Sequence, residues 1–242
     1  MKYFAANWKL HKNPQETRNF LSDFQQKYSR KSSQEVIFFP PSICLEAASQ
    51  VVKTPLQWGA QNVYSQIKGA FTGETSAQTV ADLGGKYILI GHSERRQIFH
   101  EKDELLSEKL TLVQQLGLTP MLCIGETLSE RESGKTMQVL ESQLTQGLKN
   151  FDQQKALTVA YEPVWAIGTG KVAQVAQVKE AHFEVRKILN RLGCNDKTPI
   201  LYGGSVKPDN AKELLAVPEV GGFLVGGASL EVASFLAICA SE

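Results

Sequence analysis

The chain has 242 residues, 42% of them hydrophobic, and a formal net charge of +1 at pH 7. This composition supports a sizeable apolar core, and the balanced charge argues against nucleic acid or a membrane surface as a main partner. No apolar run approaches the length of a membrane-spanning helix, so we expect no membrane partner.

The N-terminal segment Met1–Lys9 is apolar only briefly, because Asn7 and Lys9 interrupt it and no small-residue cleavage site follows. We therefore expect no signal peptide and a cytoplasmic protein. The four cysteines form no Cys-x-x-Cys pair, which favours reduced, packed thiols. The histidines show no metal-binding spacing, so we expect no metal site.

Short apolar runs alternate with helical patterns along the whole chain. Several runs are apolar on both faces, as in Tyr87–Ile90, which is typical of parallel strands covered on both sides. Their starts lie roughly 31 residues apart, about the length of one strand–helix repeat. The predicted strands are Tyr3–Trp8, Glu35–Phe39, Leu56–Ala60, Tyr87–Gly91, Thr119–Ile124, Leu157–Glu162, Pro199–Gly203 and Gly222–Val225.

Helical patterns fill the gaps between these strands. The segment Asn13–Glu16 combines an N-cap residue, a proline at the first helical position and a glutamate three residues after the cap. Apolar residues recur at helical spacing between residues 105 and 116 and between 175 and 192. His182 lies on the second of these apolar faces, so we interpret it as a packed core histidine.

Eight strand–helix pairs, without a linker or a change of composition, predict one domain over residues 1–242. The predicted fold is α/β, a closed eight-stranded parallel (β/α)8 barrel. An open doubly wound sheet is the alternative, but it would prefer a Gly-x-Gly-x-x-Gly turn after its first strand, and the sequence has none there. Barrels place their chemistry at the carboxyl ends of the strands, so those positions carry the functional argument.

The first strand ends in Asn7, Trp8 and Lys9. Alternate side chains of a strand face the same way, so Asn7 and Lys9 are predicted to point into the barrel mouth while Trp8 packs outward. An inward lysine in a largely apolar run indicates a functional role. The alternative is a lysine whose ammonium group simply reaches solvent.

The fourth strand is followed by His92, the first polar side chain after a buried run. The residues after it can open a helical turn whose free amides favour a neutral imidazole ring. Glu94 is close enough in sequence to face the same mouth and pair with Lys9. We interpret Arg96, in contrast, as part of a solvated run of charges.

The sixth strand ends at Glu162, a carboxylate poorly placed for structure and well placed for chemistry. Pro163 fixes the chain direction after it. Residues 165–167 are largely apolar, and Gly168 and Gly170 permit backbone conformations and amide exposure that other residues resist. We interpret this segment as a lid; for the glycines alone, an ordinary loop with two turns is the alternative.

Glycine pairs follow the last two strands, at Gly203-Gly204 before Ser205 and at Gly226-Gly227. The second pair opens a short helix. Backbone amides in this arrangement form an anion cradle, and many barrels bind phosphate at this place.

Taken together, these segments closely resemble the triosephosphate isomerase family. The resemblance covers nearly the full length in the family's order and implies a TIM barrel. It rests on Asn7–Lys9, Gly69–Glu74, Gly91–Arg96, Cys123–Thr127, Ala160–Lys171, Tyr202–Ser205 and Gly226–Leu230.

The resemblance implies interconversion of dihydroxyacetone phosphate and D-glyceraldehyde 3-phosphate without a cofactor. Glu162 would move the proton between the two carbons, and His92 would polarise the carbonyl group. Lys9 and Asn7 would stabilise the enediolate charge, and Glu94 would hold Lys9 or support His92. The phosphate would be bound through the backbone amides of Gly168, Ser205, Gly226 and Gly227.

The segment Tyr64–Thr75 is long for a loop in a compact domain, and we expect Phe71 at its exposed tip. By resemblance, it would dock into a second subunit near Asn7 and Lys9, with Thr72 at its tip, and form a homodimer. A mobile surface loop is the alternative.

Two other functions stay open on the residues alone. One is a different phosphate-binding barrel such as a Schiff-base aldolase, for which Lys9 is the only candidate lysine, and the other is a binding protein without catalysis. Cys123, at a strand end near the site, is interpreted as a packing residue.

Overall fold

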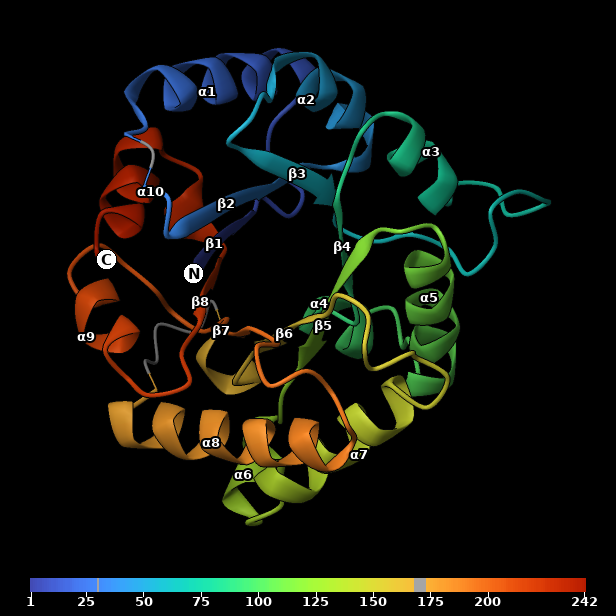
Figure 1. The fold of residues 1–242 in the computed structure, drawn as a ribbon, viewed down its shortest axis with the longest axis vertical. Coiled ribbons are helices and arrows are strands. Elements are labelled where there is room, and N and C mark those ends of the chain that lie inside the picture. Colours follow the sequence, from blue (N-terminus) through green and yellow to red (C-terminus); the bar gives the residue numbers. More distant parts are fainter. Residues whose placement is uncertain (30, 168–172) are drawn as a thin grey trace.

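The computed structural model describes residues 1–29, 31–167 and 173–242. Its strands form a closed barrel in the order β1 to β8, with every neighbouring pair parallel (Figure 1). Their bounds are β1 Lys2–Asn7, β2 Gln34–Phe39, β3 Gln57–Ala60, β4 Tyr87–Ile90, β5 Thr119–Ile124, β6 Thr158–Tyr161, β7 Ile200–Tyr202 and β8 Gly222–Val225.

The barrel closes where β1 pairs with β8, from Tyr3 opposite Gly222 to Ala6 opposite Val225. This pairing confirms the predicted closed barrel, and the open-sheet alternative is wrong. Four predicted strands extend one residue too far at the carboxyl end, because Trp8, Gly91, Glu162 and Gly203 lie just after the last strand residue. The chain leaves the ladder at the barrel mouth and turns there into the site loops.

The helices form a ring around the barrel (Figure 1). The capping box predicted at the first of them is present, since Asn13 accepts from the amide of Glu16 and the Glu16 carboxylate accepts from the amide of Asn13. The helix bounds are α1 Pro14–Lys27, α2 Leu45–Val51, α3 Ala77–Asp82, α4 Ser93–Gln97, α5 Asp103–Gln115, α6 Leu128–Glu132, α7 Thr136–Gly147, α8 Val175–Arg191, α9 Ala211–Leu215 and α10 Val232–Cys239, with 3-10 turns η1 Ser42–Cys44, η2 Val164–Ala166 and η3 Gly227–Ser229. Among the described residues, no helix is long and apolar enough to cross a bilayer.

The buried side chains form two clusters that reflect the alternation along each strand. Ala5, Ile37 and Leu89 belong to the smaller cluster, together with other strand residues from around the barrel, and fill its interior. Trp8 belongs to the larger cluster, packing on Phe20 with ring centroids 4.9 Å apart, as predicted for an outward side chain. His182 of α8 is completely buried, which confirms its interpretation as a core histidine.

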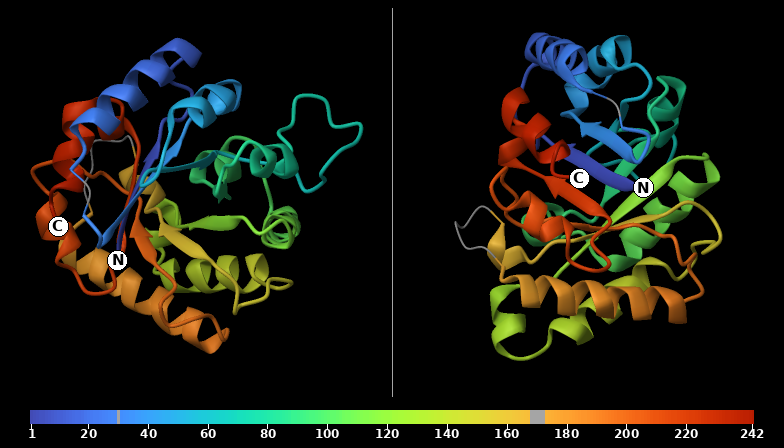
Figure 2. Two further views of the ribbon diagram at one scale, coloured as in Figure 1. Left: turned by 45° about the horizontal axis from the view of Figure 1, so that its top comes forward. Right: turned by 60° about the vertical axis from the view of Figure 1, so that its left-hand side comes forward.

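The segment between β3 and α3 extends away from the barrel (Figure 2). Its ends are joined by the amide of Tyr64, which donates to the carbonyl of Thr75 at 3.0 Å. The rings of Tyr64 and Phe71 pack with centroids 4.3 Å apart, so the segment is held by its own side chains. Phe71 and Thr72 are nevertheless exposed, as predicted for its tip.

Candidate active site

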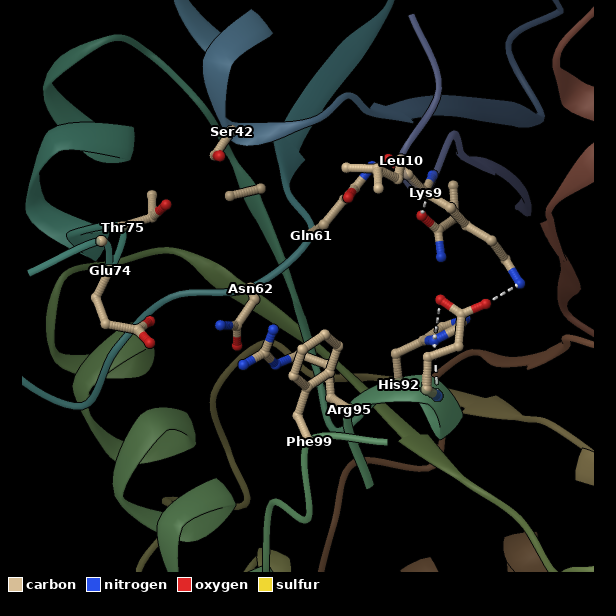
Figure 3. A pocket seen from close by; sticks show the side chains of 14 residues that line it. Lys9, Leu10, Ser42, Gln61, Asn62, Glu74, Thr75, His92, Arg95 and Phe99 are labelled. Carbon is tan, nitrogen blue, oxygen red and sulfur yellow. Dashed lines mark hydrogen bonds and ion pairs between the residues drawn. The ribbon is translucent and has the colours of Figure 1, made fainter. Parts of the chain in front are cut away.

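The carboxyl ends of β1, β4, β6, β7 and β8 surround one cavity of about 260 Å³. Most of the predicted site residues line it: Asn7, Lys9, His92, Glu162, Ser205, Gly226 and Gly227. Glu94 lines a neighbouring cavity of about 310 Å³, which shares Asn7, Lys9 and His92 with the first (Figure 3). Gly168 and Gly170 of the predicted lid lie outside the described residues, because the structure does not describe residues 168–172.

Glu162 follows β6 directly and is only 2% exposed. Its Oε2 atom accepts a hydrogen bond from the backbone N–H of Ser93 at 2.9 Å, and its Oε1 atom lies 3.1 Å from Nε2 of His92. The carboxylate has room because residue 203 is glycine, where a Cβ atom would lie 2.8 Å from Cγ of Glu162. Three loops that are distant in sequence therefore meet at this one buried acid.

His92 is the N-cap residue of α4, and its Nδ1 atom accepts a hydrogen bond from the backbone N–H of Glu94 at 3.2 Å. A nitrogen that accepts must carry a lone pair, so the proton of the neutral ring lies on Nε2, the nitrogen that faces Glu162. The helical turn predicted after this histidine is present, and its amide selects the tautomer.

His92 and Glu162 shift each other's acidity. Burial opposes ionisation of Glu162, but His92, the Ser93 amide and Lys9 outweigh it and hold the pKa of Glu162 below its ordinary value. Burial also opposes a charged His92 ring, and there the Glu162 carboxylate raises the pKa above the ordinary value of 6.5. Both shifts depend on the contact between the two side chains.

Lys9 follows β1 and extends between the two cavities. Its Nζ atom forms an ion pair with Oε1 of Glu94 at 2.6 Å, which is the pairing predicted from the sequence. Asn7 is only 4% exposed, and its side-chain oxygen accepts from the backbone N–H of Lys9 at 3.0 Å. The remaining amide group of Asn7 is a donor, so Asn7 at the end of β1 and Lys9 just beyond it both place donors in the cavity wall with His92.

The glycines after β8 leave open space for an anion. A Cβ atom at Gly227 would meet no atom within 4 Å, whereas one at Gly226 would lie 3.4 Å from Cε of Lys9. Gly227 opens the η3 turn, whose first amides have no acceptor within the turn itself. The predicted cradle thus lies beside Lys9, on the β8 side of the cavity.

The sequence model of one family, described as triosephosphate isomerase, matches residues 2–242. The chain belongs to the triosephosphate isomerase family. It is 62% identical to the triosephosphate isomerase of Bdellovibrio bacteriovorus, over 97% of each chain. Its identity to the triosephosphate isomerase of Chlamydia muridarum is 48%, over 98% of this chain and 90% of the relative, and to that of Thermodesulfovibrio yellowstonii 42%, over 98% of each.

Within this member of the triosephosphate isomerase family, the described base of the lid is anchored to Glu126. This carboxylate is fully buried after β5 and accepts from the indole N–H of Trp165 at 2.9 Å and from the hydroxyl of Tyr161 at 3.1 Å. Arg131 completes its environment at 3.0 Å. The hydroxyl of Ser205 donates to the carbonyl of Ala166 at 2.8 Å, which joins the β7 loop to the same segment.

Glu126 has no predicted role, and the free amides after His92 were predicted to face only the imidazole ring, whereas the amide of Ser93 binds Glu162. A carboxylate just beyond a buried strand identified Glu162, and a similar signal is present at Glu126, two residues after the end of β5. The pattern after His92 predicted the free amides of a helical turn, but not that the amide of Ser93 would bind a carboxylate from β6. The interpretation of Arg96 as a solvated charge is wrong, because its side chain is only 10% exposed and pairs with Asp103 at 2.6 Å.

Proposed function

We propose that this protein interconverts dihydroxyacetone phosphate and D-glyceraldehyde 3-phosphate by proton transfer through an enediolate, as a step of glycolysis and gluconeogenesis. Membership of the triosephosphate isomerase family supports the reaction. The observation that carries the residue assignment is the single cavity that holds Glu162, His92 and the glycine cradle. We assign no cofactor, because the reaction only moves protons within one molecule.

Glu162 is the proposed base, the role of the glutamate in this family. It removes a proton from the carbon beside the carbonyl group and returns it to the neighbouring carbon. A carboxylate in water is too weak for this step. Burial disfavours the charged form and raises basicity once Glu162 turns from His92 and Ser93 towards the substrate.

His92 is the proposed electrophile, acting as a neutral ring through its Nε2–H group. It polarises the carbonyl oxygen and moves a proton between the two substrate oxygens. Lys9 and Asn7 stabilise the enediolate charge, and Glu94 fixes the Lys9 ammonium group. Because these donors are held by the fold before the substrate arrives, they need little reorganisation during the reaction.

The substrate phosphate is proposed to bind the backbone amides of Gly168, Ser205, Gly226 and Gly227. Phosphate held at the cradle and at the lid draws the lid over Glu162, so binding energy from the non-reacting end of the substrate assists the chemistry. Closure also excludes water and protects the enediolate from loss of phosphate.

A coupled assay with purified protein and D-glyceraldehyde 3-phosphate tests the activity, with a phosphate-bearing enediolate mimic as inhibitor. Turnover that the mimic inhibits competitively is expected; binding of the mimic without turnover would indicate a non-catalytic binder. An aldolase mechanism needs a neutral amine, whereas Lys9 is paired with Glu94 at 2.6 Å. Borohydride with substrate is therefore expected to trap no adduct.

We also infer a homodimer. The cavity of about 310 Å³ lies between the site and the base of the loop 64–75, with His92 on one side and Thr75 on the other (Figure 3). Leu10 and Phe99 line it and are 96% and 61% exposed, so two large apolar side chains of the same cavity wall face solvent in the single chain. The corresponding loop of a second copy, with Thr72 at its tip, is the proposed occupant.

A cytoplasmic location is the last part of the proposal. All four cysteines are free and buried, which suits a reducing compartment. Fractionation of the source cells, followed by the isomerase assay on each fraction, tests it.

A further inference from the structure

Arg96, in the short helix α4, is turned back towards the barrel. Its Nε atom donates to the carbonyl of Gly91 at 2.9 Å, and its Nη2 atom donates to the carbonyl of Cys123 at 3.1 Å. Nη1 pairs with Oδ1 of Asp103, in the first turn of α5, at 2.6 Å. Every nitrogen of the planar guanidinium group therefore has a partner, as its rigid fork geometry permits.

These carbonyls continue the pairing of two strands. The ladder between β4 and β5 ends at Ile90 opposite Leu122. Gly91 is the first residue after β4, and Cys123 is the next residue of β5 after Leu122. Arg96 bridges their carbonyls where the ladder between the two strands has ended. A guanidinium group thus fixes the spacing of β4 and β5 at the barrel mouth, where the backbone alone does not.

Each bridged residue leads directly to a proposed catalytic group. Gly91 is followed by His92. Cys123 lies opposite Ala160 of β6, and the carbonyl of the next residue, Ile124, accepts a hydrogen bond from the backbone N–H of Glu162 at 2.7 Å. The Arg96 side chain therefore holds the backbone next to both the electrophile and the base.

Two further observations fit a role in positioning. A Cβ atom at Gly91 would lie 3.1 Å from Nη2 of Arg96 and 2.8 Å from Cδ1 of Leu106, so a glycine there permits the close approach. Arg96 is not one of the described residues that line the two cavities at the mouth. Its effect on the reaction must therefore pass through the backbone that it holds.

We propose that Arg96 is a positioning residue, which bridges the ends of β4 and β5 and thereby sets the distance between His92 and Glu162. The inference rests on the isomerase mechanism proposed above. Arg96 holds the ends of β4 and β5, whereas the phosphate cradle follows β7 and β8 on another part of the rim. We therefore expect Arg96 to affect the reacting groups and not the binding of phosphate.

The test is the variant Arg96→Lys, which keeps the charge but replaces the fork with a single ammonium group. Small displacements of reacting groups cost up to about 100-fold in rate, so we expect kcat to fall by about 10- to 100-fold. Affinity for the enediolate mimic should fall with it. The inhibition constant of inorganic phosphate probes only the cradle. It should change by less than about threefold, because the variant leaves the amides that bind phosphate in the ground state and the transition state unchanged.

Rates are expressed per active site, counted by titration with the mimic, so that a loss of folded protein does not pass for a loss of kcat. Arg191→Lys is the matched control, since Arg191 also pairs with a carboxylate at 2.6 Å, that of Glu141, but is largely exposed. We expect it to leave all three constants unchanged. If Arg96→Lys does not fold, Asp103→Asn keeps the carbonyl bridge but removes its counter-charge, and we expect a smaller fall in kcat with the same unchanged phosphate inhibition.

Wild-type kcat per site in Arg96→Lys would overturn the inference, as would a parallel loss of kcat and phosphate affinity. In the Asp103→Asn arm, wild-type kcat would do the same. Absence of isomerase activity in the wild-type protein would overturn the proposed function together with this inference, so the two failures are distinguishable.

Discussion

The Nε2 atom of His92 lies 3.1 Å from the Oε1 atom of Glu162. The proposed electrophile and the proposed base are therefore in direct contact. At this distance the carboxylate raises the pKa of the ring, and the ring lowers the pKa of the carboxylate. Substrate must separate them, because its carbonyl oxygen needs the Nε2–H group and its carbon needs the carboxylate. When they part, Glu162 loses contacts that lower its pKa and keeps the burial that raises it.

Shortening the base by one methylene group, in Glu162→Asp, is expected to lower kcat by about 100-fold or more, since the carboxylate no longer reaches the substrate carbon. The fold should persist because the charge and its burial are kept. The coupled isomerase assay and circular dichroism measure the two outcomes. Near-normal turnover would remove Glu162 from the mechanism.

A methyl group placed beside the base, in Gly203→Ala, is expected to displace Glu162, because the new Cβ atom would lie 2.8 Å from its Cγ atom. We expect kcat to fall by about 10- to 100-fold with a folded protein. Gly147→Ala is the matched control, since a Cβ atom there meets Cδ2 of Leu122 at an ordinary 3.4 Å within α7. Equal kcat values for the two variants would contradict the assignment.

Stability at acid pH is expected to depend on His182. Its Nδ1 atom lies 3.2 Å from the carbonyl of Glu219, and burial lowers its pKa from 6.5 to about 4. In the unfolded chain His182 therefore binds a proton as pH falls below about 6.5, whereas in the folded protein it stays neutral until pH approaches about 4. The stabilisation is complete above pH 6.5 and is lost as pH falls towards 4, by about 3 kcal/mol for a shift of this size.

Denaturant unfolding of wild-type protein and His182→Gln between pH 4.5 and 7 measures this loss. Glutamine keeps a donor for the Glu219 carbonyl but does not titrate. The free energy of unfolding should therefore depend less steeply on pH in the variant. Identical slopes would show that another group is responsible.

Association is expected to depend on the loop 64–75. The variant Phe71→Asp places a charge on a side chain that is 38% exposed near the loop tip, and we expect a monomer with reduced activity. Phe183→Asp is the control, because Phe183 is 56% exposed on α8, away from that loop. Sedimentation velocity at nanomolar to micromolar concentration distinguishes the species; a dimer in Phe71→Asp, or an active wild-type monomer, would refute the proposed interface.

Residue order alone determined the strands, the barrel and the ends at which polar side chains gather. It did so because two-faced apolar runs alternating with helical patterns have few stable arrangements, and because strand ends in a parallel barrel all meet at one rim. The inward Asn7 and the outward Trp8 follow from strand alternation, and the Lys9–Glu94 pair follows from proximity at the rim. Lys9 itself lies in a turn beyond β1 with φ +50°, so the turn and not the strand pattern directs its side chain into the cavity wall.

Only the tertiary structure decided which groups support that site. The sequence pattern around Arg96 predicts a surface charge. In the folded chain, Gly91 and Cys123, which are 32 positions apart in the sequence, both bind its guanidinium group. The contact of Ser93 with Glu162 uses a backbone amide, which every residue except proline possesses. Such contacts depend on distances between separate loops, and those distances exist only once the barrel has closed.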